Sequence, residues 1–192
     1  MGEGEVHDAN GVEMPTMQAL GAAGIKPIEL EAKEGLALIN GTDGMLGMLI
    51  MACADLEQLC AVADITTAMS IEGLLGTDRV FAPDLHFPLR PQVGQAQSAA
   101  NIFAMLKGSP IVASHRENDS RVQDAYSLRC APQVAGAVRD TIAHAAIIAT
   151  RELASAIDNP VVQPDGRVES NGNFHGAPVA YVLDFLAIAA TD

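Results

Sequence analysis

Apolar residues recur at steps of three and four positions along much of the chain, which is the spacing of a helix with one buried face. The longest such stretch covers residues 43–75. Its apolar stripe consists of Leu49, Cys53, Leu56, Cys60 and Ala63. Acidic residues, Asp64 among them, stand between these positions. The pattern therefore predicts one helix that is long by the standards of globular proteins.

Three further helices are predicted downstream. One covers residues 93–106 and ends before the turn-forming Gly108-Ser109-Pro110. Another begins near Pro132 and is stopped by Asp158-Asn159-Pro160. Its stripe consists of Val134, Val138, Ile142, Ala146, Ala149, Leu153 and Ile157. The last helix covers residues 179–190 after a proline.

The helix over residues 179–190 is apolar nearly all round, so we expect other helices to surround it. It runs to Asp192 without a cap, a glycine or a polar tail. We therefore expect these 192 residues to be one piece of the helical domain of a larger protein.

The remaining segments read as connections. Residues 1–28 are weakly periodic and predict a loop with at most a short helix at about 14–23. Three prolines make residues 76–92 a connecting loop, and residues 111–129 are polar and irregular. Val161-Val162 and Arg167-Val168-Glu169 flank a Pro164-Asp165-Gly166 turn, which predicts a small β-hairpin. The expected fold is mainly α, a bundle of long helices with one small β-hairpin.

Composition supports helices and narrows the function. Hydrophobic residues make up 49% of the chain, but only 4% are aromatic and none is Trp, which favours packed helices over a β-sandwich. The net charge of -13, without a basic run, argues against binding to nucleic acid or to an anionic membrane. We see neither a signal-peptide pattern nor an uncharged apolar run of about 20 residues.

The cysteine pattern points to a reducing compartment. Cys53, Cys60 and Cys130 are an odd number without a Cys-x-x-Cys spacing. We expect them to be free thiols, with Cys53 and Cys60 buried in a helix. Together with the absence of a signal-peptide pattern, this predicts a cytoplasmic protein.

Three polar residues stand at three-residue steps in one irregular segment. Gln123, Tyr126 and Arg129 precede the helix that begins near Pro132. The planar guanidinium of Arg129 offers two parallel donors, which suits a carboxylate ligand. The alternative is capping of the helix start, with an ion pair between Arg129 and Asp124.

Two other residues are candidates for ligand binding, and each also has an ordinary structural explanation. Asn40 ends an apolar run at an Asn-Gly pair, where it binds a ligand or simply forms a turn. Phe174 lies in a Gly- and Asn-rich loop, where it contacts a ligand or packs locally. His86 and His115 stand in separate loops without the spacing of metal ligands, so no metal site is predicted.

Four segments favour the functional interpretation of these candidate residues over the ordinary one. Together they resemble signatures of the histidine and aromatic-amino-acid ammonia-lyases. They occur in the expected order, and the resemblance covers the whole chain. The segments are residues 30–42 (LEAKEGLALINGT), 122–134 (VQDAYSLRCAPQV), 158–160 (DNP) and 172–176 (GNFHG). The resemblance implies a fold of the fumarase/aspartase-like helical class, assembled as a homotetramer whose active sites are built from three subunits.

The resemblance also implies a role for each candidate residue. Tyr126 is implied as the catalytic residue that assists proton transfer, with Gln123 beside it lining the substrate. Arg129 is implied to bind the substrate carboxylate. Asn40 borders the electrophile of such enzymes, and Phe174 packs beside it.

That electrophile is a methylidene-imidazolone formed from an internal Ala-Ser-Gly. The 192 residues contain no Ala-Ser-Gly, which the family carries shortly upstream of the segment that resembles Gly2-Glu3-Gly4. We therefore expect no cofactor within this chain and no activity from it alone.

The implied activity is elimination of ammonia from a small amino acid, in which L-histidine gives urocanate. A tyrosine or phenylalanine ammonia-lyase or aminomutase shares every motif quoted above and stays a rival. A non-catalytic helical scaffold, or a piece that serves oligomerisation, is the second rival.

Overall fold

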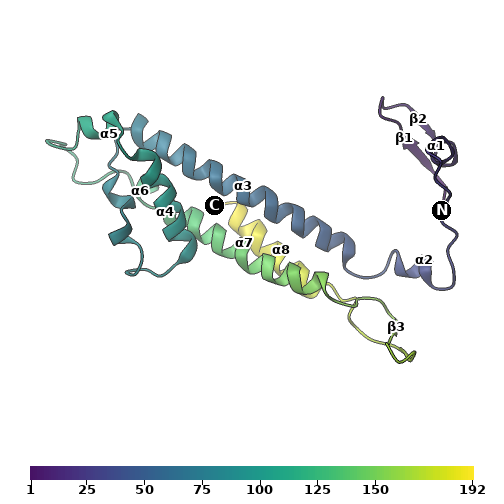
Figure 1. The fold of residues 1–192 in the computed structure, drawn as a ribbon. Helices are drawn as coiled ribbons and strands as arrows, with labels where there is room; N and C mark the ends of the chain where they lie inside the picture. Colours follow the sequence, from purple (N-terminus) through teal and green to yellow (C-terminus); the bar gives the residue numbers. More distant parts are fainter. The chain divides into compact units, whose positions relative to one another are not determined.

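A computed structural model describes residues 1–192, which form two compact units. The larger unit comprises residues 42–156 and 175–192. It contains the long helices α3 (Asp43–Gly73), α4 (Val93–Leu106), α7 (Ala131–Leu153) and α8 (Ala177–Ala190). Helices α3, α7 and α8 run side by side, as Figure 1 shows. All four helices were predicted from the sequence, and the mainly α fold class is confirmed.

Helix α3 is long enough to contribute to two separate cores. Its first half packs against α7 and α8. This core consists of Leu46, Leu49, Cys53, Cys60, Ile142, Ala145, Ala149, Val179, Val182 and Leu186. The second half of α3 packs against α4 and against the connections around α4. The second core consists of Ala68, Ile71, Phe81, Ile102, Leu106 and Val112. The unit is therefore held together along the whole length of α3.

A buried ion pair joins α3 to α7 between these cores. Arg139 Nη2 donates to Asp64 Oδ2 at 2.6 Å, and Asn101 Nδ2 donates to the same oxygen at 2.8 Å. Arg139 Nε also donates to Ser98 Oγ at 2.9 Å. Asp64 follows Cys60 by four positions, so it lies on the buried stripe of the helix, and only 2% of it is exposed. The sequence did not reveal its basic partner, because Arg139 lies 75 residues away.

Short elements fill the connections of the larger unit. They are the 3₁₀ turns η1 (Arg79–Phe81) and η2 (Pro83–Leu85) and the short helices α5 (Pro110–Ser114) and α6 (Tyr126–Arg129). The loop predicted over residues 76–92 is confirmed. Residues 111–129 were predicted to be irregular, yet part of α5 and all of α6 lie within them.

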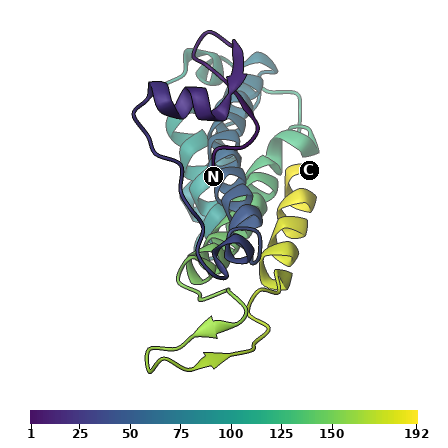
Figure 2. The same cartoon turned by 90° about the vertical axis from the view of Figure 1, so that its right-hand side faces the viewer.

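The smaller unit comprises residues 1–41 and 157–174. It contains α1 (Thr16–Ala22), α2 (Glu34–Ala37) and two antiparallel two-stranded sheets. The first sheet pairs β1 (Glu5–His7) with β2 (Glu13–Pro15), and the second pairs β3 (Val161–Val162) with β4 (Val168–Glu169). Figure 2 shows the predicted β3–β4 hairpin clearly.

The sequence predicted only one hairpin, and that count was wrong. Between β1 and β2, Asp8 Oδ1 accepts hydrogen bonds from the backbone nitrogens of Asn10 and Val12, both at 2.8 Å. Gly11 follows with a φ of 79°, a conformation that glycine adopts without strain. The tight turn therefore depends on one side chain and one glycine rather than on an apolar pattern, which is why periodicity missed it.

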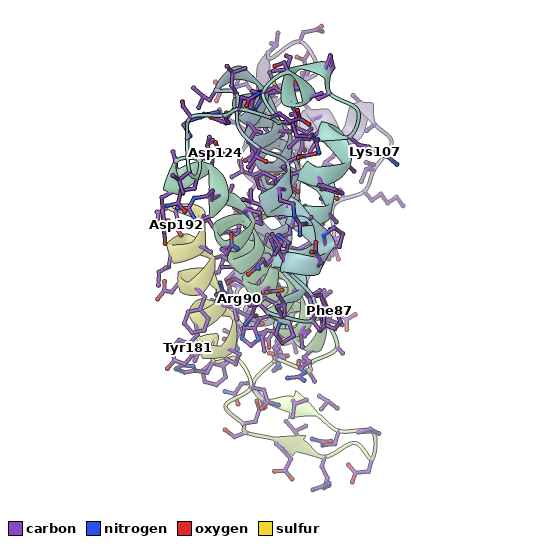
Figure 3. All side chains as sticks on the ribbon, turned by 90° about the vertical axis from the view of Figure 1, so that its left-hand side faces the viewer. Phe87, Arg90, Lys107, Asp124, Tyr181 and Asp192 are labelled. Carbon is purple, nitrogen blue, oxygen red and sulfur yellow. The ribbon has the colours of Figure 1, made fainter.

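The end of α7 and the surroundings of α8 within this chain were not evident from the sequence. Helix α7 ends at Leu153, so Asp158-Asn159-Pro160 is not its stop. Helix α8 buries only Val179, Val182 and Leu186, and its other apolar side chains remain exposed. Tyr181 points away from the helices in Figure 3. The helices expected to surround α8 are therefore not within these residues, and their presence in the full-length protein stays a prediction.

Among the helices of this chain, α3 alone has the length and hydropathy needed to cross a bilayer, a criterion that core helices of soluble proteins also meet.

Candidate active site

The segment that leads into α6 is fixed by the buried side chain of Asp124. Its Oδ2 accepts a hydrogen bond from the Thr77 backbone nitrogen at 2.7 Å. Its Oδ1 lies 3.5 Å from Arg121 Nη1. Because a buried carboxylate is stable only when it is paired and hydrogen-bonded, these contacts hold the segment against the end of α3.

Arg129 and Tyr126 are brought together at the two ends of α6. Arg129 Nε donates to the backbone oxygen of Asp124 at 2.9 Å, and its guanidinium carbon lies 6.0 Å from the centre of the Tyr126 ring. The alternative of an ion pair between Arg129 and the Asp124 carboxylate is therefore wrong. The terminal nitrogens of Arg129 have no hydrogen-bond partner within the chain. They are free to bind a carboxylate with two parallel hydrogen bonds.

Tyr126 faces an open, mainly apolar groove of about 440 Å³. Residues of α3, α7 and the end of α8 form the walls, including Cys60, Val138 and Ala189. Tyr126 is 75% exposed, and its hydroxyl makes no hydrogen bond within the chain. Arg129 does not line this groove, so Tyr126 is the candidate site residue that it contains.

Gln123 lies apart from that groove. It lines a separate polar hollow of about 200 Å³, together with His115 and Arg121. The equal three-residue spacing suggested that Gln123, Tyr126 and Arg129 converge, but within this unit only Tyr126 and Arg129 do. The intervening Asp124 explains this difference, because its side chain is buried while its neighbours are exposed.

Asn40 and Phe174 both belong to the smaller unit, where they adjoin one polar cluster. Asp158 pairs with Lys33 there. This pairing is the main cause that lowers the pKa of the Asp158 carboxyl, and a hydrogen bond from the Asn40 side chain lowers it further. Phe174 is 38% exposed in the loop that follows this cluster.

Sequence reasoning missed Lys33 and gave Asp158 the wrong role. Both residues lie inside motifs that carry the family resemblance, so the motifs contained the signal. The motif that holds Lys33 also contains Glu31 and Glu34, so its sequence does not single out Asp158 as the partner of Lys33. Only the fold brings them together across 125 positions of sequence.

The cysteines are free, as predicted, and two of them are unsuited to nucleophilic chemistry. Burial raises the pKa of the Cys53 and Cys60 thiols, which keeps them protonated. Cys130 is half-buried. No group of three or more His, Cys, Asp or Glu side chains is arranged to hold a metal ion.

Comparison with known proteins adds a decisive observation. The family model described as aromatic amino acid lyase matches residues 1–192, the whole chain. The chain belongs to this family. The resemblance that four motifs indicated is thereby confirmed.

Two kinds of relative illustrate the match. The chain is 66% identical over 192 residues to a histidine ammonia-lyase from Streptomyces coelicolor. The alignment covers all of this chain and 37% of that protein. The crystal structure of a tyrosine aminomutase from Streptomyces globisporus matches with a TM-score of 0.87 at 39% identity, over 99% of this chain and 39% of that one. A histidine ammonia-lyase from Trypanosoma cruzi matches with a TM-score of 0.83 at 40% identity, over 98% of this chain and 34% of that one. The chain thus spans well under half the length of these relatives.

Proposed function

We propose that these residues form the central part of a histidine ammonia-lyase, a carbon–nitrogen lyase that converts L-histidine to urocanate and ammonia. The observation that carries the proposal is the 66% identity to a histidine ammonia-lyase over the entire chain. Identity to the tyrosine aminomutase is lower, at 39%. The free guanidinium of Arg129 beside the phenol of Tyr126 supports the same reaction.

In this reaction a proton leaves the β-carbon and ammonia leaves the α-carbon. The electrons of the broken C–H bond form the new double bond as the C–N bond breaks. Arg129 binds the substrate carboxylate through its two free terminal nitrogens. Tyr126 accepts the β-proton at its hydroxyl oxygen. The acceptor in this step is a phenolate oxygen, which becomes a phenol when it takes the proton.

The remaining residues have supporting roles in this proposal. Gln123 lines the substrate. Asn40 and Phe174 would border the methylidene-imidazolone, because an amide donor and an apolar ring suit a planar group that carries a carbonyl oxygen. That group, when present, supplies the electrophile that activates the amine for departure. The 192 residues contain no Ala-Ser-Gly to form it, so we assign its source to another part of the full-length enzyme.

We further propose that the full-length enzyme is a cytoplasmic homotetramer of histidine catabolism that binds neither nucleic acid nor membrane. The net charge of -13 supports the exclusion of nucleic acid and of anionic membranes. Support for assembly comes from the large apolar side chains left exposed on α3 and α8. They include Met48, Met51, Ile65, Met69, Tyr181, Phe185 and Ile188.

A direct comparison of substrates tests the proposal. The full-length enzyme is incubated separately with L-histidine, L-tyrosine and L-phenylalanine, and the ultraviolet absorbance of each unsaturated acid is followed. We expect the largest kcat/KM with L-histidine. A larger value for either aromatic substrate, or formation of a β-amino acid, would instead support a tyrosine or phenylalanine lyase or aminomutase. No turnover of any of the three would support the scaffold.

A further inference from the structure

The structure assigns to Lys33 and Asp158 a role as positioning residues that set the geometry of Asn40. This inference deepens the proposed function and rests on it, because Asn40 gains its importance from bordering the electrophile. The ion pair itself touches neither substrate nor electrophile in this assignment. It acts through the short segment of residues 33–40.

Asp158 lies close to both ends of that segment. At one end, its Oδ2 pairs with Lys33, which immediately precedes α2. At the other end, the Asn40 side chain is near enough to the same carboxyl group to lower its pKa. Between them, the Asn40 backbone nitrogen donates to Leu36 O at 2.9 Å. The segment is therefore a short helical turn that the ion pair anchors at its start, which limits the positions that the Asn40 amide can take.

The backbone conformation of Lys33 is energetically unfavourable for a residue that has a side chain. Its φ of 73° lies in the left-handed region, which a residue with a side chain rarely adopts. Such conformations persist only where surrounding contacts hold them, and they concentrate at functional sites. Two contacts anchor Lys33: its side chain pairs with Asp158, and its carbonyl oxygen accepts from the Ala37 backbone nitrogen at 3.0 Å.

The same cluster also fixes the loop that leads to Phe174. Asn171 Nδ2 donates to Asp158 O at 2.9 Å, and Asn159 Oδ1 accepts from the Asn171 backbone nitrogen at 2.9 Å. Phe174 follows three residues later. One cluster thus links two of the residues assigned to the electrophile, although they are 134 positions apart in the sequence.

A double-mutant cycle in the full-length enzyme tests the assignment. We expect Asp158→Asn to lower kcat roughly 10- to 100-fold with a smaller change in KM, because small misplacements of a group at the reacting centre are costly. Asn40→Ala should also lower kcat. The double variant should be no slower than Asn40→Ala alone, because Asp158 acts through Asn40. Additive losses would overturn the assignment.

Asp165→Asn is the matched control. Asp165 also pairs with a basic side chain, Arg167, but in the β3–β4 turn. It should keep wild-type kinetics. Lys33→Met should reproduce the kcat loss, and Lys33→Arg should restore most of it, which keeps the test valid if Asp158→Asn folds poorly. Equal losses in Lys33→Arg and Lys33→Met would count against the assignment.

Amide hydrogen exchange provides a readout that needs no substrate. We expect faster exchange at the backbone nitrogen of Asn40 in Lys33→Met than in the wild type or in Asp165→Asn. If the wild-type enzyme makes no urocanate, the proposed function fails, yet this readout still decides whether the ion pair orders the segment. Unchanged exchange at Asn40 would overturn the assignment whatever the activity.

Discussion

Gly94 of α4 and Gly136 of α7 lie in direct backbone contact. A Cβ atom on Gly94 would stand 2.2 Å from Gly136 O, and one on Gly136 would stand 2.3 Å from the backbone nitrogen of Gln95. Both distances are far shorter than any carbon atom tolerates. The two helices approach this closely because neither has a side chain at the crossing, and Gly94 N donates to Asp140 Oδ1 at 2.9 Å beside it.

Gly136→Ala should therefore destabilise the fold. Relief of the overlap requires α4 and α7 to separate, and overpacking of this kind costs about 1–3 kcal/mol. The free energy of unfolding, measured by urea titration with circular dichroism, tests this. Gly47→Ala is the control, because Gly47 lies in α3 with nothing within 4 Å of its added Cβ. It should be neutral or stabilising by a few tenths of a kcal/mol to about 1 kcal/mol. Equal effects of the two substitutions would contradict the prediction.

In the full-length enzyme, Arg129→Ala should weaken transition-state binding by about 2–5 kcal/mol, the range for removing one partner of a desolvated charge pair. Arg129→Lys should recover only part of this, because an ammonium cannot reproduce the two parallel hydrogen bonds of a guanidinium. The kcat/KM for L-histidine measures both effects. Arg167→Ala, in an exposed hairpin, is the control and should be neutral. Wild-type kinetics in both Arg129 variants would show that Arg129 does not bind the carboxylate.

Local patterns predicted the long helices well, because a helix is specified by contacts three and four residues apart. Helix α4 was predicted with its observed bounds. Pro160 was predicted to stop α7, but the helix ends seven residues before it. The pairing of Tyr126 with Arg129 also followed from local spacing. The contacts of Gly94 with Gly136 and of Lys33 with Asp158 join distant segments, so no local pattern could reveal them.

The three thiols should react at different rates in the folded chain. Burial raises the pKa of Cys53 and Cys60, and the thiolate is the reactive form. A thiol-specific reagent at about pH 8.5, the ordinary thiol pKa, should therefore modify Cys130 first. The two slow rates should continue to rise above that pH, because a raised pKa shifts thiolate formation to higher pH. Cys130→Ala should remove the fast phase, and unfolding in urea should make all remaining thiols equivalent. Three equal rates in the native chain would contradict the burial of Cys53 and Cys60.

The 192-residue chain alone should have no ammonia-lyase activity. It contains no Ala-Ser-Gly from which the electrophile is formed. Without that group, Tyr126 and Arg129 can at best hold the substrate, because the amine remains a poor leaving group. Urocanate absorbance after incubation with L-histidine measures this. Turnover above a buffer blank that disappears in Arg129→Ala would show the prediction to be wrong.

The 192-residue chain alone should also self-associate through α3 and α8. Met48 and Met51 on α3, and Phe185 and Ile188 on α8, are at least half exposed. Leaving about 500 Å² of apolar surface in water forfeits on the order of 12 kcal/mol at about 25 cal/mol per Å². That is comparable to the stability of a whole domain. Pairing of two chains recovers part of it, and the net charge of -13 opposes association mainly at low salt.

Light scattering after size exclusion measures the association, and Ile188→Glu should shift the chain toward the monomer. Val162→Glu is the matched control, because Val162 is similarly exposed but lies in the β3–β4 hairpin. It should leave the association unchanged. Since a charge on α8 disrupts pairing only if that face is buried between chains, the difference between the two variants identifies the surface. A sharp monomer at tens of micromolar wild-type chain, without binding of a hydrophobic dye, would contradict the prediction.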